Sequence, residues 1–413
     1  MNGRAWRVCR FGVVATGVFW GSACLAQQLE KATIDGVYQG TLGKEEIVLE
    51  VGAQPPKPTD PAIPQDFVGR YFYRRYGVSI FMQGEPLKDG SIRLREYQGS
   101  EETGAQWRVR FQGDKATGIF CKCKVDNMGI SKRGLKITLR RVSKGFDPGL
   151  GEKSFERPPD EAYYDLLVDF PLVTGPEVGI DKDMAYEVQS DPRFKVGVPQ
   201  LTRFPDEAVM AEINGDFARE LRKDRIWVAG CLAGEGRGGS YEEKMNVTVF
   251  TRDVLSVVKD RQFYCGGAYP DGETEAWTYD MRAGERVNLY GLLQKEIDAE
   301  KIKNPVARDD RSFPLSDLYL RRYVLPAGVK AEECDGILQR DEDGDTDSRP
   351  TLVQSPEMVL FLKKNGLVIM PVFPHAYQGC GPEVTIPYRE ILPLVAKDGV
   401  FRAMVASIEE SGK

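Results

Sequence analysis

The sequence predicts an α+β protein in which an N-terminal antiparallel β-meander or small barrel precedes an α+β domain with a mainly antiparallel sheet. Two observations predict this order. Short runs of alternating apolar residues, separated by Gly, Asp and Asn, fill residues 34–142 without any helical period. After residue 160, helical spacing occurs among further strands, and strand and helix do not alternate regularly.

The first 26 residues have the three parts of a secretory signal. Three arginines precede an apolar run at residues 11–23, and small residues precede the expected cleavage site after Ala26. This run of about 13 residues is shorter than the roughly 20 that a spanning helix needs. We expect a periplasmic or secreted protein with no permanent membrane span in the mature chain. Lipidation of Cys24 and a retained anchor are the alternatives.

Residues 30–145 are expected to form the meander or barrel. The eight expected strands span residues 36–40, 46–51, 69–74, 78–82, 92–97, 107–111, 117–121 and 135–142. Closing them into a barrel would hide the strand edges. The alternation leaves open whether the interior holds a ligand, and an interior filled by side chains is the favoured interpretation.

A segment at residues 146–160, which contains Pro, Gly and charged residues, is the expected linker to an α+β domain at residues 161–413. The expected helices span residues 160–170, 205–223, 316–320 and 388–395, and the last of these is expected to be the final helix. The expected strands span residues 244–251, 254–260, 275–280, 358–362 and 367–372. In the longest helix, Val209, Ile213, Phe217 and Leu221 recur every four residues and therefore share one face.

The charge differs between the two parts of the chain. The formal net charge of −6 becomes −9 when the three signal arginines are removed. Residues 27–145 carry 20 Lys and Arg against 14 Asp and Glu, which is +6, so residues 146–413 carry −15. The basic part would suit an anionic envelope polymer and the acidic part a cationic protein. Ordinary solvated surfaces are the plainer interpretation, and nucleic acid is not an expected partner in this compartment.

Six cysteines remain after the signal, and an even number in an exported chain predicts disulfides. They are Cys121, Cys123, Cys231, Cys265, Cys334 and Cys380. The favoured pairs are Cys231 with Cys265 and Cys334 with Cys380, since each would tie a Gly-rich or acidic loop to a strand end, although six cysteines allow 15 pairings. A strained Cys121–Cys123 bridge and a zinc site at this C-x-C pair stay open.

Four motifs carry a resemblance to a known family. They are EIN at residues 212–214, VLSVVKDRQFYCGGAYPDG at 254–272, WTYDMRAGERVNLYGLL at 277–293 and GLVIMPVFPHAYQGCGPEVTIPYREI at 366–391. In this order they resemble a bacterial family of extracytoplasmic domains of unknown function. The family includes the sensing domain of the lysozyme-binding anti-sigma factor and accessory domains of secreted peptidoglycan deacetylases. The resemblance covers roughly residues 180–395, in the C-terminal part only.

The resemblance implies a binding or interaction protein, with a cationic protein such as lysozyme, or peptidoglycan, as the partner. Tyr269 is a departure, because family members commonly have His there. The chain has no counterpart of the cytoplasmic and membrane-spanning parts of an anti-sigma factor, which argues against a signalling role. The glycines and prolines of the motifs indicate tight turns. Tyr269, His375 and Tyr377 are the candidates for a partner-binding rim.

Catalytic motifs are scarce. His375 is the sole histidine of the chain, so a multi-histidine metal site cannot form and a Ser-His-Asp arrangement would have to use it. The G-x-G-x-x-G match at residues 234–239 leads into an expected strand, whereas a dinucleotide site needs a helix. We expect no catalytic residue and no cofactor. The alternative is an envelope hydrolase that acts on glycans through paired carboxylates, which the abundant acids leave open.

The remaining candidate is a calcium site at Asp341, Asp343, Asp345 and Asp347. An EF-hand loop requires Gly at its sixth position and Glu at its twelfth. Neither register of this segment places both residues correctly. A solvated acidic loop is therefore the favoured interpretation, and no metal is expected.

Overall fold

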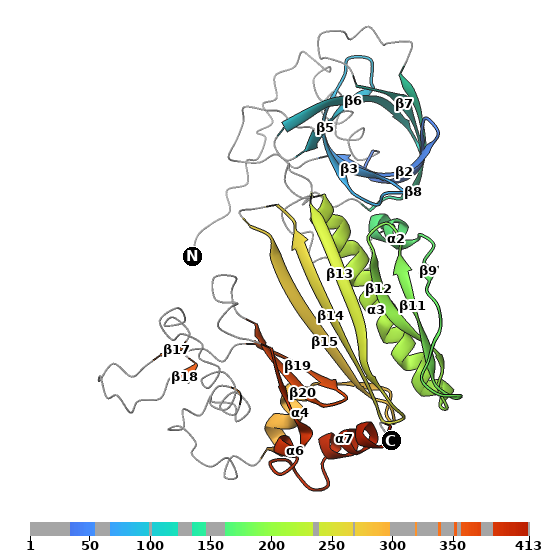
Figure 1. Ribbon diagram of the computed structural model, residues 1–413. Helices are drawn as coiled ribbons and strands as arrows, with labels where there is room; N and C mark the ends of the chain where they lie inside the picture. The colour runs from blue at the N-terminus through green and yellow to red at the C-terminus, as the bar shows by residue number, and fades with distance from the viewer. Residues whose placement is uncertain are drawn as a thin grey trace, which may run out of the picture. The chain divides into compact units, whose positions relative to one another are not determined.

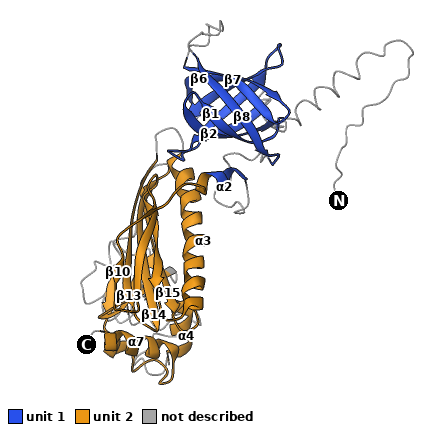
Figure 2. Ribbon diagram, turned by 90° about the vertical axis from the view of Figure 1, so that its right-hand side faces the viewer, with its two compact units in different colours: residues 1–166 blue, residues 167–413 orange. Residues whose placement is uncertain are grey.

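The computed structural model describes residues 34–53, 67–98, 101–122, 134–145, 162–233, 239–266, 269–297, 319, 338–339, 351–352, 357–372 and 383–411. The chain divides into two compact units, residues 1–166 and residues 167–413 (Figure 2). The sheets are antiparallel in both units. The expected α+β class, with a β-barrel first and an α+β region second, is confirmed.

Unit 1 contains a closed barrel of eight strands in sequence order (Figure 1). Its strands are β1 (Gly36–Leu42), β2 (Glu45–Ala53), β3 (Phe67–Tyr73), β4 (Ile80–Pro86), β5 (Ile92–Gln98), β6 (Glu101–Gln112), β7 (Lys115–Lys122) and β8 (Leu135–Ser143). Each strand pairs with the next, and β8 pairs with β1 to close the ring. Closure leaves no unpaired edge in the ring, which removes the main liability of a β-meander.

The interior of the barrel is a packed core. An eight-stranded barrel is just wide enough for side chains to fill. The rings of Tyr71 and Trp107 meet edge to face with centres 4.7 Å apart. The buried Glu96 carboxylate accepts hydrogen bonds from the Tyr71 hydroxyl at 2.5 Å and from Trp107 Nε1 at 3.1 Å. Among the described residues, Glu96 is the one buried acid of the barrel interior, and its hydrogen-bond donors are uncharged side chains.

Part of the outer barrel surface is also buried. Helix α2 (Ala162–Val168) places Tyr163 and Tyr164 over β3, where the Arg70 guanidinium lies 4.3 Å from the centre of the Tyr163 ring. Arg70 Nε donates to Glu50 at 2.7 Å, and its Nη1 donates to the Tyr164 hydroxyl at 2.9 Å. A buried charge is tolerated when it is paired and hydrogen-bonded, as it is here.

Unit 2 begins with a sheet that was not expected, made of β11 (Ala185–Asp191) and β12 (Val196–Arg203) with the short strands β9 (Val173–Thr174) and β10 (Val178–Gly179). Helix α3 (Glu207–Leu232) packs on β12. Asp206 caps the helix by accepting hydrogen bonds from two backbone amides of the first turn. The helix is longer than predicted, because it continues past residue 223.

The central sheet of unit 2 contains β13 (Ser240–Phe250), β14 (Val254–Tyr264), β15 (Asp271–Asp280) and β16 (Glu285–Val287). Gly284 has a φ of 73° in the turn between β15 and β16, as expected for a hairpin glycine. Along β14, alternate residues face opposite sides. Val257 and Lys259 face α3, while Ser256 and Val258 face the next sheet, where Leu362 N donates to Ser256 Oγ at 3.1 Å.

The third layer is a sheet of β19 (Glu357–Lys363), β20 (Gly366–Val372) and β21 (Val384–Ile386). It shares a core with three helices, α4 (Leu289–Glu296), α6 (Tyr388–Ile391) and α7 (Val400–Ser411). Two residue pairs, β17 (Leu338–Gln339) and β18 (Thr351–Leu352), form a further small ladder. The expected helix at 316–320 lies outside the described residues apart from position 319.

Two helix predictions near the C-terminus are wrong. The helix that starts at Tyr388 ends at Ile391 rather than at residue 395, because Pro393 has no N–H to continue the helical hydrogen bonds. It is also not the last helix, since α7 follows it and buries Phe401, Met404 and Val405. Within the described part of the chain, no helix combines the length and the apolar character needed to span a membrane.

Candidate functional site

Most candidate residues from the sequence lie outside the described residues. This applies to His375 and Tyr377, to the acidic segment with Asp341, Asp343, Asp345 and Asp347, and to Cys123, Cys334 and Cys380. Tyr269 is described, and 74% of it is exposed between β14 and β15. Cys121 is disulfide-bonded to a partner outside the described residues. Among the residues described, no group of three or more His, Cys, Asp or Glu could hold a metal ion.

Cys231 and Cys265 form a disulfide, with an S–S distance of 2.03 Å. This is the pairing expected for these two cysteines. Cys231 lies in the last turn of α3, not in the Gly-rich loop that follows it, and Cys265 directly follows β14. The bond therefore joins the end of the long helix to the end of the central strand that it covers.

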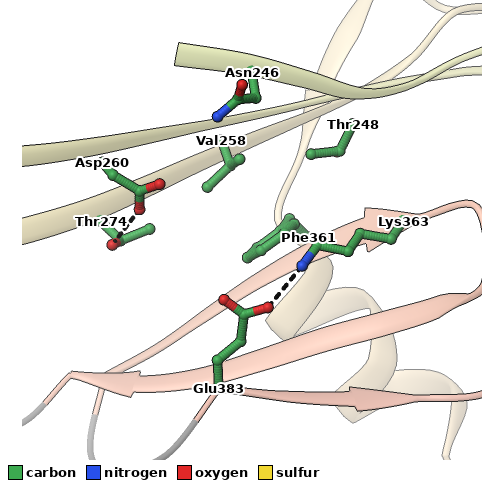
Figure 3. A pocket seen from close by; sticks show the side chains of 8 residues that line it. All are labelled: Asn246, Thr248, Val258, Asp260, Thr274, Phe361, Lys363 and Glu383. Carbon is green, nitrogen blue, oxygen red and sulfur yellow. Dashed lines mark hydrogen bonds and ion pairs between the residues drawn. The ribbon is translucent and has the colours of Figure 1, made fainter. Parts of the chain in front are cut away.

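A polar pocket lies between the central sheet and the β19–β21 sheet of unit 2 (Figure 3). Its volume is about 220 Å³. The residues that line it are Asn246, Thr248, Val258, Asp260, Thr274, Phe361, Lys363 and Glu383. Val258 and Phe361 are buried and belong to one small apolar cluster, so they form the floor, while the other side chains are polar and form the walls.

The polar walls contain two internal hydrogen bonds. The Thr274 hydroxyl donates to Asp260 Oδ1 at 2.7 Å across β14 and β15. Lys363 Nζ donates to Glu383 Oε1 at 2.7 Å, from β19 to the residue before β21. Figure 3 shows these pairs on opposite walls. Glu383 is thus neutralised by a lysine, whereas Asp260 forms no ion pair with any other described residue.

This arrangement favours recognition of one small group. Pockets for drug-sized ligands and cofactors enclose about 300–1,000 Å³, which is more than this pocket offers. The amide of Asn246 adds a neutral donor and acceptor to the pocket. The Thr248 hydroxyl donates to the Ser256 carbonyl at 3.1 Å and therefore adds an acceptor. A cationic or hydroxyl-bearing side group of a larger partner fits this chemistry.

Behind the pocket, the other face of the central sheet contains a buried charge network. Lys259, which is fully buried, donates to Asp224 Oδ2 of α3 at 2.6 Å. Arg261 donates from Nη2 to Asp224 Oδ1 at 3.0 Å and to Glu275 Oε2 at 2.5 Å. The network fixes β14 against α3. Asp260 lies between Lys259 and Arg261 in the sequence, but its side chain faces the pocket on the opposite side of the sheet.

Two acids in or beside this network, Asp224 and Glu243, have raised pKa values. Burial raises the pKa of Asp224, against the opposing effects of Lys259 and Arg261. Burial also raises the pKa of Glu243, which accepts hydrogen bonds from the Tyr241 hydroxyl at 2.5 Å and from the Gly197 amide at 3.1 Å. Burial in this region therefore favours protonation of Asp224 and Glu243 more than water does.

The sequence interpretation did not identify any pocket residue as a candidate. The only local signal was Asp260, a charged residue on the β14 face where Val254, Ser256 and Val258 are buried. The other lining residues come from two sheets that are far apart in the sequence, and Asn246 and Lys363, for example, are separated by 117 positions. Such a pocket depends on how the two sheets pack, and no local motif predicts that.

No protein-family model matches the chain, and no curated protein matches it. Two solved structures of the DUF3298 family are similar to it. One, from Bacteroides fragilis, has 13% identity and a TM-score of 0.33, covering 58% of this chain and 96% of its own. The other, from Pseudomonas aeruginosa PAO1, has 14% identity and a TM-score of 0.33, covering 56% and 97%. Both belong to a bacterial domain family of unknown function, and their names state neither an activity nor a partner.

Proposed function

We propose that this chain is an exported binding or interaction protein of the cell envelope, and that the polar pocket of unit 2 receives a cationic group of its partner. The observation that carries the proposal is Asp260, a carboxylate in a pocket wall that forms no ion pair with a described residue. Lys244 of β13 is its cross-strand neighbour, but the two side chains are not paired. A cationic protein such as lysozyme is the partner class that fits best, and cell-wall material is the second.

The charge of the chain supports a cationic partner. Residues 146–413 carry a formal net charge of −15. A surplus of this size attracts cationic proteins over distances near the Debye length, which is about 8 Å at physiological salt, and it raises their association rate. The Asp260 carboxylate would then act at short range, where one charge-assisted hydrogen bond fixes the position of a bound cation.

The compartment in this proposal has separate support. The predicted signal at residues 1–26 directs the chain out of the cytoplasm. The Cys231–Cys265 disulfide is compatible with an oxidising compartment, because such bonds are rare where thiols are kept reduced. Neither observation identifies the partner, so the proposal depends on the pocket and on the charge.

A glycan hydrolase is the second candidate, because two carboxylates, Asp260 and Glu383, line the same pocket. A hydrolase of this kind needs one carboxylic acid that stays protonated to donate to the leaving group. Here Glu383 is bound by Lys363 at 2.7 Å and Asp260 by the Thr274 hydroxyl at 2.7 Å, so both carboxyl groups are already engaged within the pocket walls. The geometry therefore supports binding more than hydrolysis.

Retention on immobilised partners tests the proposal. Mature protein is passed over immobilised lysozyme and over insoluble peptidoglycan at low salt, with a neutral protein as the control surface. We expect retention on lysozyme that is lost at high salt. Failure to bind either material would remove the proposal. Release of reducing sugar ends from peptidoglycan by the parent but not by Glu383→Gln would establish the hydrolase instead.

A further inference from the structure

The outer wall of the barrel in unit 1 contains an excess of basic residues. Strands β7 and β8 contain two and three Lys or Arg residues respectively, and neither strand contains an Asp or a Glu. The adjacent β6 adds Arg108 and Arg110, while its two acids, Glu101 and Glu102, lie at the start of the strand. Figure 2 shows these three strands side by side in the barrel wall. Positive charge is therefore concentrated on three neighbouring strands of the barrel wall.

Strand alternation points five of these cations outward. They are Arg108 and Arg110 of β6, Lys115 of β7, and Lys136 and Arg140 of β8, and we call them the basic face. Their neighbours in sequence, such as Val109, Ala116 and Ile137, are buried in the barrel core. Since successive residues of a strand face opposite sides, the five cations project to the exterior.

The register brings the cations of the basic face together. Lys115 pairs directly with Arg140 across β7 and β8. Ile119 lies between Arg108 of β6 and Lys136 of β8 in one cross-strand row. Like charges that lie directly opposite in a sheet repel each other and cost stability. The fold thus holds these cations close to one another.

Counterions cover only one edge of the basic face. Asp89 pairs with Arg108 at 2.7 Å and with Arg110 at 3.4 Å. Lys115, Lys136 and Arg140 form no ion pair with the described residues. Asp89 is therefore the one carboxylate that pairs with the basic face among the described residues. The positive charges on β7 and β8 have no described counterion.

A row of hydroxyl groups runs between the cations. Thr117 of β7 pairs with Thr138 of β8, which pairs with Thr41 of β1. This row lies two residues along the strands from the Lys115–Arg140 pair and two from the Ile119–Lys136 pair. The surface thus presents hydroxyl donors and acceptors flanked on both sides by positive charge.

We propose that the basic face binds an anionic polysaccharide. Its cations match the acidic groups of such a chain, and its threonine row matches the sugar hydroxyls. Each strand of an eight-stranded barrel occupies about 45° of the circumference, so β6 and β8 face directions about 90° apart. A flat lipid surface cannot contact both strands, whereas a flexible chain can follow the curvature. The proposal concerns unit 1 and does not depend on the pocket of unit 2.

Polygalacturonate, a linear polysaccharide with one carboxylate per sugar ring, is the probe. Its binding to the mature protein is measured by calorimetry at a series of salt concentrations. The test variant is Lys115→Gln/Lys136→Gln/Arg140→Gln. The matched control is Lys295→Gln/Lys364→Gln/Arg389→Gln, which removes three exposed positive charges from unit 2 and causes the same change in net charge.

We expect the parent and the control to bind, with affinities that fall steeply as salt is added. Each cation that contacts a flexible polyanion adds about 0.7 to the slope of the logarithm of affinity against the logarithm of salt concentration. The test variant lacks three such cations, so between 50 and 200 mM salt the parent should lose roughly 20-fold more affinity than the test variant. If the triple variant does not fold, Arg140→Gln alone should reduce this loss roughly threefold.

Three results would overturn the proposal. The first is an equal effect of the test and control variants, which would mean that only net charge matters. The second is equally tight binding of neutral dextran. The third is binding to phosphatidylglycerol vesicles, weakened by the test variant, without any binding to polygalacturonate.

Discussion

The two units of this protein use antiparallel sheets in different ways. In the barrel of unit 1, each strand has one face inside and one outside, and the interior acid Glu96 is matched by neutral donors of Tyr71 and Trp107. In unit 2, β14 is buried on both faces and carries Lys259 and Arg261 into the interior. The barrel core depends on apolar packing, whereas the central sheet of unit 2 also depends on matched charges.

This difference leads to different sensitivities to mutation. An apolar core loses stability in proportion to the atoms removed and the cavity left behind. A buried charge network loses stability when one partner is removed, because the remaining charges stay buried without compensation. The predictions below test this contrast.

The largest expected effect is in the charge network. Lys259→Met leaves Asp224 and Glu275 with one fewer cation, so we expect unit 2 to lose about 3–5 kcal/mol of stability. Hydrogen exchange should show the loss in α3 and in β13–β15, with the barrel unchanged. The exposed Lys364→Met is the control and should change stability by less than about 0.5 kcal/mol. Equal protection in parent and variant would show that the network contributes nothing.

A cavity in the barrel should have a smaller effect of a different kind. Leu94 is fully buried in the barrel interior, and Leu94→Ala should cost about 2–4 kcal/mol. Because the ring is closed, protection should fall in all eight strands together, while unit 2 keeps its protection. The control is Val142→Ala at a half-exposed position on the outer wall. A loss confined to β5 would contradict a cooperative barrel.

The smallest effect concerns pH. Burial raises the pKa of Glu243 above its ordinary value of 4.5. A raised pKa means that the folded state binds this proton more tightly than the unfolded state. Its stabilising contribution is full below about pH 4.5 and is lost as pH rises through the folded pKa.

Glu243→Gln should remove this contribution, so the difference in stability between variant and parent should change by about 1 kcal/mol or less between pH 7 and pH 5. Urea denaturation of both proteins at the two pH values measures the change. Glu242→Gln, at the exposed neighbouring position, is the matched control. The same pH dependence in parent and Glu243→Gln would contradict the assignment.

The contrast also explains what the sequence could predict. The barrel strands were predictable because buried residues alternate with less buried ones from Ile92 to Tyr97 in β5 and from Ala105 to Arg110 in β6. The end of α3 was not predictable, because its buried face changes from Phe217 and Leu221 to Asp224 and Arg225. An apolar period cannot reveal a helix that buries charges.

Other elements were missed for separate reasons. Strand β11 (AYEVQSD) is half-buried through its middle and lacks a clear alternation. Helix α7 carries the helical spacing of Phe401, Met404, Val405 and Ile408, so the sequence does contain a local signal for this helix. The pocket had no such signal, because Asp260 meets Lys363 and Glu383 only through the packing of two sheets.

The central claim, that Asp260 receives a cationic group of the partner, is tested most directly by calorimetric titration of lysozyme into parent, Asp260→Asn and Asp398→Asn proteins. Asp398 is exposed and lies outside the pocket, so both variants change the net charge equally. We expect Asp260→Asn to weaken binding about fivefold, which corresponds to roughly 1 kcal/mol for a partly exposed charge pair, and Asp398→Asn to leave it nearly unchanged. Equal affinities for the two variants would contradict the claim.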